Sequence, residues 1–513
     1  MEIFQDLALR LLRVHSLRKR FLKEILIKVQ IFETKMGCIV RIFKLGFFSA
    51  LLAGFVAVGI GYWYQQSIKP LNMPETGYWG PALIKKGTTP PGDDEAIYNY
   101  KVSFDDKLVT SLKQELARTK WVEPLEDARY HYGVNPNSFR KIIEYWQNQY
   151  DFKKAEAAIN SYPHYQTQIE GIKIHFFRSA PTKTDNKTKI IPLLLIHGWP
   201  GSFVEFLKIA GQLSKPVDEI AFDVIVPSIP GYGYSEPSRK QGMNVLTTAR
   251  IFKKLMSRIG YSKYYAQGGD WGAAIVNAMG VLYPDSLRGL HVNIVFQNYQ
   301  NPWTLLKLIA FTWFPNIVGD GELPFCMPIP FSRFFFRLIR ESGYFHIQST
   351  KPDTIGFALL NSPAGLAAYI LEKFSTWTSD KFRLLEDGGL TNKFTIDELL
   401  TNVMVYYSSG SIVSSQRYYK ENVSSHLTRQ LFKQSVRIPA GYSVFPHDLV
   451  CAPRALVMDT YTNLTMVNYH KDGGHFAAYE LPNALEADIR KFVQGVEETY
   501  PEEIHASKGF MAV

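Results

Sequence analysis

Short apolar runs that alternate with helix-like stretches are the feature of this sequence that most restricts its fold. From about residue 170, the apolar runs "GIKIHFFRSA", "KIIPLLLIHGW" and "FDVIVPSIPGYGYS" lead into turns containing Gly or Pro, and the helix-like stretch "TTARIFKKLMSRIG" follows. Buried strands that alternate with helices form a parallel sheet covered on both faces. The sequence therefore predicts an α/β fold whose mostly parallel sheet occupies residues 170–298 and resumes at residues 435–513.

A carboxylate stands at the sharpest turn of this pattern. The predicted strand "SKYYAQGGD" ends at Asp270, and the predicted helix "WGAAIVNAMGVLY" begins directly after it. Gly268-x-Asp270-x-Gly272 has the spacing of the nucleophile elbow, which exposes one side chain, often a serine, at the top of a sheet. A carboxylate that attacks a saturated electrophilic carbon forms an ester that water can hydrolyse. Asp270 therefore predicts a covalent step on an epoxide or a carbon–halogen bond.

A base and an orienting acid are expected on the last two loops of the sheet. His475 in "KDGGHFAAYE" follows the predicted last strand, where it can take a proton from water. Asp448 in "FPHDLV" follows the preceding strand and is the predicted orienting acid, with Asp459 as its rival. The order Asp270, Asp448, His475 is the nucleophile–acid–base order of the α/β-hydrolase fold.

The loop "HGWPGS" at residues 197–202 follows another predicted strand. A hydrolase places a backbone N–H at this point to stabilise a developing negative charge. We expect the amides of Trp199 and Trp271 to form this oxyanion hole.

Two further regions surround the predicted sheet. The alternation stops at residues 299–434, which contain helical stretches and are predicted to form a helical lid inserted between late strands. Residues 65–169 are predicted to form an N-terminal wrapping and helical domain: Pro and Gly are frequent at 70–91, and helices are expected at 104–160, with a possible N-cap at Ser103.

The N-terminal region predicts attachment to a membrane. Residues 45–64 are 20 residues without a charge, enough for a helix to span about 30 Å of hydrocarbon. We expect a retained anchor here, and a cleaved signal peptide is the alternative. Residues 1–44 read as a basic amphipathic segment suited to a membrane surface, and Met36 is an alternative start.

Charge and cysteine content exclude several classes of protein. The net charge is +10, but residues 1–44 hold ten Lys/Arg and four Asp/Glu, which leaves only +4 for the rest of the chain. This distribution does not predict a nucleic-acid partner. The three cysteines are too few for a disulfide framework or a zinc site, so we expect unpaired thiols. The expected chemistry uses water and needs no metal or organic cofactor.

Eight stretches of the sequence resemble the microsomal epoxide hydrolase family, which includes juvenile hormone epoxide hydrolases. They are "GYWGPA", "HGWPGSFVEF", "IPGYGYS", "QGGDWG", "ESGYFHIQSTKPDTIGFAL", "SSQRYYKEN", "FPHD" and "GGHFAAYE", and they extend from about residue 70 to 495. The resemblance implies that Asp270 is the nucleophile, His475 the base and Asp448 the orienting acid. It also implies an enzyme of the endoplasmic reticulum membrane that converts lipophilic epoxides to vicinal diols.

Two lid tyrosines follow from the same resemblance. The family's tyrosines that bind the epoxide oxygen correspond to Tyr344 in "SGYFHIQ" and Tyr419 in "RYYKEN", and Tyr418 is the local rival of Tyr419. Phenols suit this task because a pKa of about 10 keeps them protonated at neutral pH. Position alone would not select these two among 29 tyrosines.

Other interpretations of function and topology stay open at this point. A haloalkane dehalogenase also uses an elbow aspartate, often followed by a Trp such as Trp271, and a membrane-tethered binding protein could share the fold. Lys/Arg flanking the anchor predict a luminal catalytic domain, whereas the resemblance implies a cytosolic one. The sequons at Asn186, Asn422 and Asn463 would become acceptors only in the lumen.

Overall fold

The computed structural model describes residues 58–81, 89–181, 187–298, 301–313 and 331–501, together with residues 49, 54 and 56. The chain divides into two units, Met1–Ser67 and Ile68–Val513, and the second contains the predicted sheet and lid. The predicted amphipathic segment 1–44 and most of the predicted anchor lie outside the described residues.

The described residues were also searched for helices that could cross a bilayer. No single helix among them is both long and apolar enough, although α14 (Pro352–Leu360) and α15 (Pro363–Thr376) pass the test together as a bent pair. Cys451 is disulfide-bonded, so the expectation of unpaired thiols is wrong for this residue.

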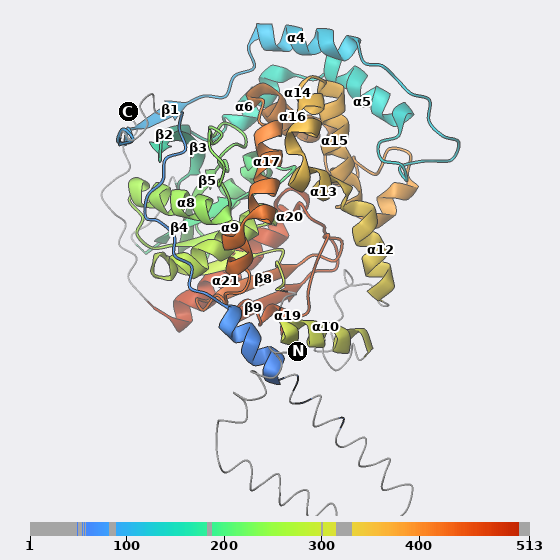
Figure 1. The fold of residues 1–513 in the computed structure, drawn as a ribbon. Coiled ribbons are helices and arrows are strands. Elements are labelled where there is room, and N and C mark those ends of the chain that lie inside the picture. The colour runs from blue at the N-terminus through green and yellow to red at the C-terminus, as the bar shows by residue number, and fades with distance from the viewer. Residues whose placement is uncertain are drawn as a thin grey trace, which may run out of the picture. The chain divides into compact units, whose positions relative to one another are not determined.

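One sheet of nine strands forms the centre of the described structure (Figure 1). Its order is β1-β2-β3-β5-β4-β6-β7-β8-β9, and the pairs from β5 to β9 are all parallel. β6 and β8 are buried along their whole lengths, which requires cover on both faces of the sheet. The predicted α/β-hydrolase fold with a mostly parallel sheet is therefore confirmed. The strands are β1 Ile97–Tyr100, β2 His164–Ile169, β3 Ile172–Ser179, β4 Lys189–Ile196, β5 Ile220–Pro227, β6 Tyr264–Gly268, β7 Leu287–Val292, β8 Ala440–Val444 and β9 Leu464–Tyr469.

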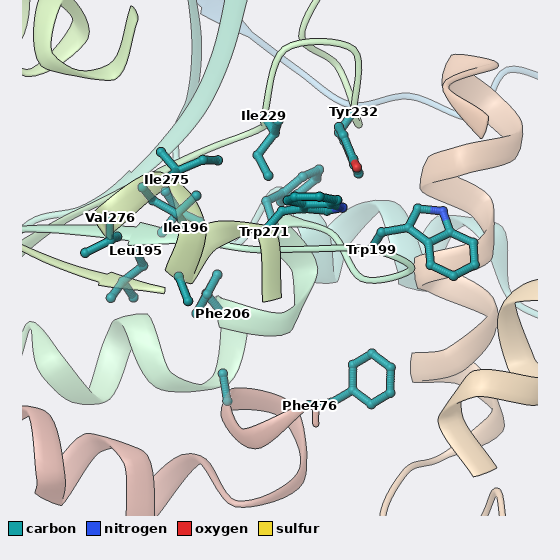
Figure 2. Packing of buried hydrophobic residues seen from close by; sticks show 14 of the residues in the cluster. Leu195, Ile196, Trp199, Phe206, Ile229, Tyr232, Trp271, Ile275, Val276 and Phe476 are labelled. Atoms are coloured by element: carbon teal, nitrogen blue, oxygen red, sulfur yellow. The ribbon is translucent and has the colours of Figure 1, made fainter. Parts of the chain in front are cut away.

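Helices between the parallel strands provide that cover. α8 packs with α9, and α7 packs with α21, while α9 and α21 both contact central strands. Figure 2 shows Leu195 and Ile196 of β4 close to Ile275 and Val276 of α9, and all four side chains are fully buried. This apolar packing fixes the start of α9 against the carboxyl end of the neighbouring strand. The helices and short turns of the sheet region are η1 Phe203–Phe206, α7 Leu207–Leu213, α8 Val245–Ile259, α9 Asp270–Leu282, η2 Pro284–Ser286, α19 Arg454–Val457, α20 Ala477–Glu480 and α21 Pro482–Thr499.

The N-terminal helices precede the sheet in the chain: α4 (Asp106–Ala117), α5 (Pro136–Asn148) and α6 (Phe152–Ile159). α4 is capped by Asp105, whose side chain accepts a hydrogen bond from the Leu108 N–H at 2.7 Å, and not by Ser103. A carboxylate next to the first helical residue reaches the free N–H groups that the more distant Ser103 cannot reach.

The helical insertion lies between β7 and β8, where a lid was predicted. Within it, α13 packs against α17, and α14 packs against both α15 and α17. The insertion therefore brings together helices that are far apart in the sequence. Its described elements are α10 Pro302–Trp313, α12 Phe331–Glu341, α13 Gly343–Thr350, α14, α15, η3 Asp380–Leu384, α16 Ile396–Ser409, α17 Ile412–Ser424 and α18 His426–Leu431.

The Gly-rich stretch "GYWGPA" is held on the sheet by one buried carboxylate. Glu170, in the turn between β2 and β3, accepts a hydrogen bond from the Trp79 indole at 2.8 Å and two from the Arg250 guanidinium, each at 2.7 Å. Lys254 adds a third cationic contact at 2.9 Å. Arg250 also donates to the Pro74 carbonyl at 2.9 Å, so this side chain of α8 also holds the segment just before the stretch.

Candidate active site

Asp270 lies at a strained turn where β6 ends and α9 begins. Its φ of +48° is in the left-handed region, which is unusual for a residue with a side chain. The glycines around it permit this turn: a Cβ on Gly272 would overlap the Ile196 carbonyl, and a Cβ on Gly198 would overlap the Asp270 side chain itself. Glycine in place of larger residues thus allows three chain segments to approach one another closely around the sequence GGDWG.

The two oxygens of Asp270 have different surroundings. Oδ1 accepts a hydrogen bond from the Trp199 N–H at 2.9 Å, and Oδ2 lies 3.4 Å from His475 Nε2. The Trp271 N–H, predicted as the second oxyanion donor, makes no hydrogen bond to Asp270 among the described residues. It belongs to the first turn of α9, whose N–H groups have no partner within the helix.

His475 lies between two carboxylates. Its Nδ1 is 2.7 Å from Oδ1 of Asp448, which is fully buried and also accepts the Leu449 N–H at 2.6 Å. Burial alone would lower the pKa of His475, but the charges of Asp448 and Asp270 raise it well above its ordinary value. The two carboxylates therefore favour the protonated imidazole in the resting enzyme.

The rival acid Asp459 lies in a different environment. Its carboxylate is 2.5 Å from Lys307 Nζ and accepts a hydrogen bond from Thr304 at 2.8 Å. It thus contacts α10 of the helical insertion, and Asp448 is the acid that faces the imidazole. Distance along the sequence from His475 did not identify the correct acid. Asp448 and His475 follow the adjacent parallel strands β8 and β9, whose ends lie at the same edge of the sheet.

Two residues that hold the His475 loop were not recognised in the sequence. Glu480 accepts hydrogen bonds from the N–H groups of Gly474 at 2.8 Å and Phe476 at 2.9 Å, on both sides of the histidine. The His475 N–H donates to the Trp377 carbonyl at 2.9 Å, and the Trp377 ring packs edge-on against the imidazole at 4.9 Å. The glutamate in "GGHFAAYE" was the available signal, because a charge in an apolar stretch needs a partner.

The tyrosines Tyr344 and Tyr419 come from α13 and α17, and their ring centroids are 5.9 Å apart. The Trp199 ring stacks on Tyr344 at 5.2 Å, and the Trp271 ring meets Tyr419 edge-on at 4.9 Å. The Tyr419 hydroxyl is buried without a hydrogen-bond partner among the described residues, whereas the Tyr418 hydroxyl is bonded to Thr248 at 2.9 Å. Tyr419 therefore has a free donor next to the two tryptophans that flank Asp270.

Burial and the charge of Asp270 both raise the pKa of Tyr344 and Tyr419 well above the ordinary phenol value. Both hydroxyls stay protonated over the whole physiological pH range and can donate a hydrogen bond. A cavity of about 500 Å³ reaches Tyr344 from the outside. It is lined by aromatic side chains, among them Tyr130 and Tyr369, and by charged groups that include Arg340 and Lys373.

Glu205 is a further acidic residue near Asp270 that was not recognised in the sequence. It belongs to η1, directly after the "HGWPGS" loop, and burial raises its pKa to about 8. A Cβ on Gly201 would overlap its carboxyl group, so that glycine makes room for it. Among the described residues, no group of three or more His, Cys, Asp or Glu side chains is arranged to hold a metal ion.

Comparison with known proteins shows which protein families this chain is similar to. Residues 97–206 match the family model described as epoxide hydrolase N terminus, and residues 191–442 match the model described as alpha/beta hydrolase fold. Among curated proteins, epoxide hydrolase 1 of Oryctolagus cuniculus is 46% identical over 457 residues, which are 87% of this chain and 98% of that protein. Juvenile hormone epoxide hydrolase 1 of Ctenocephalides felis is 41% identical, over 88% of this chain and 97% of that protein.

Solved structures give the same result. The crystal structure of juvenile hormone epoxide hydrolase from the silkworm Bombyx mori matches with a TM-score of 0.79 and 38% identity, over 83% of this chain and all (100%) of that one. The structure of Aspergillus niger epoxide hydrolase matches with a TM-score of 0.64 and 27% identity, over 78% and 96% of the two chains.

Proposed function

The chain belongs to the epoxide hydrolase family and is an epoxide hydrolase, and we propose that it opens lipophilic epoxides through an ester formed on Asp270. One observation supports this mechanism above all others. Asp270 has one oxygen on the Trp199 N–H at 2.9 Å and the other 3.4 Å from His475, which in turn lies 2.7 Å from Asp448. A nucleophile, an oxyanion donor, a base and its orienting acid thus converge on one carboxyl group.

In the first step, Oδ2 of Asp270 attacks a ring carbon of the epoxide and the bond from that carbon to the ring oxygen breaks. The ring oxygen takes a proton from one of the lid phenols, Tyr344 or Tyr419, and the other donates a hydrogen bond. The products are an alkyl ester on Asp270, a free hydroxyl on the neighbouring carbon and a tyrosinate.

Once ester formation has removed the charge of Asp270, His475 gives its resting proton to the tyrosinate and becomes a neutral base. In the second step, a water molecule gives one proton to His475 and bonds through its oxygen to the carboxyl carbon of Asp270. The negative charge that develops on Oδ1 is stabilised by the Trp199 N–H and, in this intermediate, by the Trp271 N–H. The ester C–O bond breaks, and the departing alkoxide takes the proton from His475. The carboxylate is restored, and the remaining proton returns to His475, which regains its resting charge.

We also infer a membrane location from the sequence. The uncharged residues 45–64 would anchor the enzyme in the endoplasmic reticulum membrane, from which apolar epoxides can enter the lid. In this proposal, residues 65–169 wrap around the catalytic domain, and residues 299–434 are the lid that provides Tyr344 and Tyr419.

Replacement of the nucleophile tests this mechanism. Asp270→Ala should abolish diol formation from an aryl epoxide, measured by chromatography, because alanine has no carboxylate on which the ester can form. Asp285→Ala is the matched control: Asp285 also follows an apolar stretch, but it is exposed in η2 and should be replaceable without loss. Equal loss of activity in two folded variants would contradict a catalytic role for Asp270.

A further inference from the structure

A second, much smaller cavity lies beneath Asp270. Its volume is about 20 Å³, and its apolar walls include Ile196, Trp199, Phe206 and Phe476, all of which are labelled in Figure 2. Neither Tyr344 nor Tyr419 lines it, and the large cavity that reaches Tyr344 shares none of its lining residues. Asp270 therefore lines the small cavity on the core side, whereas the large cavity reaches Tyr344 on the side of the helical insertion.

The small cavity has the size and the polarity of a site for one water molecule. A buried water needs roughly 10–15 Å³ of accessible space and two to four polar partners. Asp270, His475, Glu205, Gln267 and Asn293 all line this cavity of about 20 Å³. The space is sufficient for one water and too small for an epoxide.

Two of these polar residues, Gln267 and Glu205, are buried and bring polar side-chain groups to the wall of this cavity. Gln267 donates through Nε2 to Asn293 at 3.1 Å, but its Oε1 is buried without a hydrogen-bond partner among the described residues. A buried acceptor of this kind normally has a partner, often an ordered water. Glu205, on the other wall, is 9% exposed, and its pKa of about 8 keeps it a neutral acid at pH 7.

We propose that the core-side cavity holds the water that hydrolyses the Asp270 ester, and that Glu205 and Gln267 are the positioning residues that orient this water. The inference rests on the proposed ester mechanism. His475 removes one proton of the water, Gln267 Oε1 or the carbonyl oxygen of Glu205 accepts the other hydrogen, and a lone pair of the water oxygen faces the carboxyl carbon. A neutral Glu205 can do this without placing a second negative charge next to Asp270.

This arrangement separates the two reactants in space. The substrate enters from the lid and stays on the side of the tyrosines, while the water is already present on the core side when the ester forms. Hydrolysis then requires no water to pass the bound alkyl group. A defect in the core-side cavity should therefore slow ester hydrolysis and leave alkylation intact.

The test separates these two half-reactions. Enzyme in excess is mixed with an aryl epoxide and quenched in acid at successive times; epoxide loss measures alkylation, and the mass of the Asp270 peptide measures the ester. Glu205→Leu should alkylate within about twofold of the wild-type rate and hydrolyse the ester about tenfold more slowly or worse, because misplacement by about 1 Å can cost up to 10²-fold. Glu205→Gln should restore most of the rate, because an amide also accepts and donates without a charge.

Gln267→Met provides an independent test from β6, on another wall of the cavity. This near-isosteric change removes only the polar atoms and should also prolong the lifetime of the ester. It replaces Glu205→Leu if that variant does not fold. The control is Glu123→Leu, a change of the same type at an exposed position of the N-terminal domain, which should leave both half-reactions unchanged.

Three results would overturn the inference. The first is that the ester decays at the wild-type rate in Glu205→Leu and Gln267→Met. The second is that these variants slow alkylation and ester hydrolysis equally. The third is that Glu205→Gln hydrolyses the ester as slowly as Glu205→Leu. Failure of the ester mechanism would look different, because no variant would then give a heavier Asp270 peptide at any time.

Discussion

At the scale of single residues, the charge of Asp270 acts on the three groups that move protons in the proposed mechanism. It raises the pKa of Tyr344, of Tyr419 and, together with Asp448, of His475. Ester formation removes this charge, so the pKa of all three groups should fall as the first step proceeds. The phenols become better proton donors when the alkoxide appears, and the imidazole loses its proton in time to act as a base. In the proposed mechanism, the loss of this one charge therefore promotes proton donation by the phenols in the first half-reaction and proton acceptance by the imidazole in the second.

Asp270→Asn tests this coupling without any substrate. The amide has the shape of the carboxylate and, like the ester, no charge, so burial should dominate and the pKa of His475 should fall. A pH titration of the imidazole signals by NMR measures it, with Asp285→Asn as the control that should change nothing. A His475 pKa that is the same in Asp270→Asn and wild type would contradict the coupling.

The two lid phenols should act on the first step only. Tyr344→Phe and Tyr419→Phe should each slow alkylation, by about 10²-fold, and leave hydrolysis of the ester nearly unchanged, because the phenols act on the ring oxygen. Rapid-quench kinetics with an epoxide and with an alkyl halide measure this.

The halide substrate is the internal control, since a halide leaves without a proton. Tyr418→Phe is the matched variant: its hydroxyl is bonded to Thr248, so it should cost about 1 kcal/mol of stability and little alkylation rate. Equal losses with epoxide and halide would make Tyr344 and Tyr419 packing residues.

At the scale of elements, the stretch around Trp79 depends on one buried ion pair. Arg250 and Glu170 have side chains only 4% and 2% exposed, so loss of the cation would leave a buried carboxylate with too few partners. Arg250→Met should lower the free energy of unfolding by about 3 kcal/mol, measured by urea denaturation. An effect below about 1 kcal/mol would show that Lys254 and Trp79 suffice to hold Glu170.

The matched control is an ion pair at the surface. Lys154, whose side chain is 73% exposed, lies 3.4 Å from Asp397, and Lys154→Met should change stability by less than about 1 kcal/mol. The contrast between the two variants separates burial from the mere presence of a salt bridge.

Sequence patterns predicted the elements with strong hydrophobic periodicity and missed those without it. The central parallel strands were found because they are continuous apolar runs. β1 and β2 were not, because "IYNY" and "HYQTQI" are short or polar and become strands only by pairing with β3. The order of strand ends predicted Asp270 and His475. No periodicity could place Tyr344 against Tyr419, since this contact depends on how α13 packs on α17.

At the scale of the whole molecule, the proposed mechanism takes its nucleophile and base from the sheet and its proton donors from the insertion. The same fold limits the use of the predicted glycosylation sites. Asn422 is 2% exposed and bonded to Tyr418 and Val245, so the folded enzyme has no room for a glycan there. Asn463 is partly exposed, and Asn186 lies outside the described residues.

The central claim is that the new oxygen of the diol comes first from Asp270 and only later from water. It is tested most directly by one turnover of the wild-type enzyme, in excess over an epoxide, in water enriched in ¹⁸O. The ester mechanism predicts an unlabelled first diol and one ¹⁸O in the Asp270 peptide, because water attacks the carboxyl carbon. Label in the first diol, with none in that peptide, would mean that water attacks the epoxide directly and would contradict the mechanism.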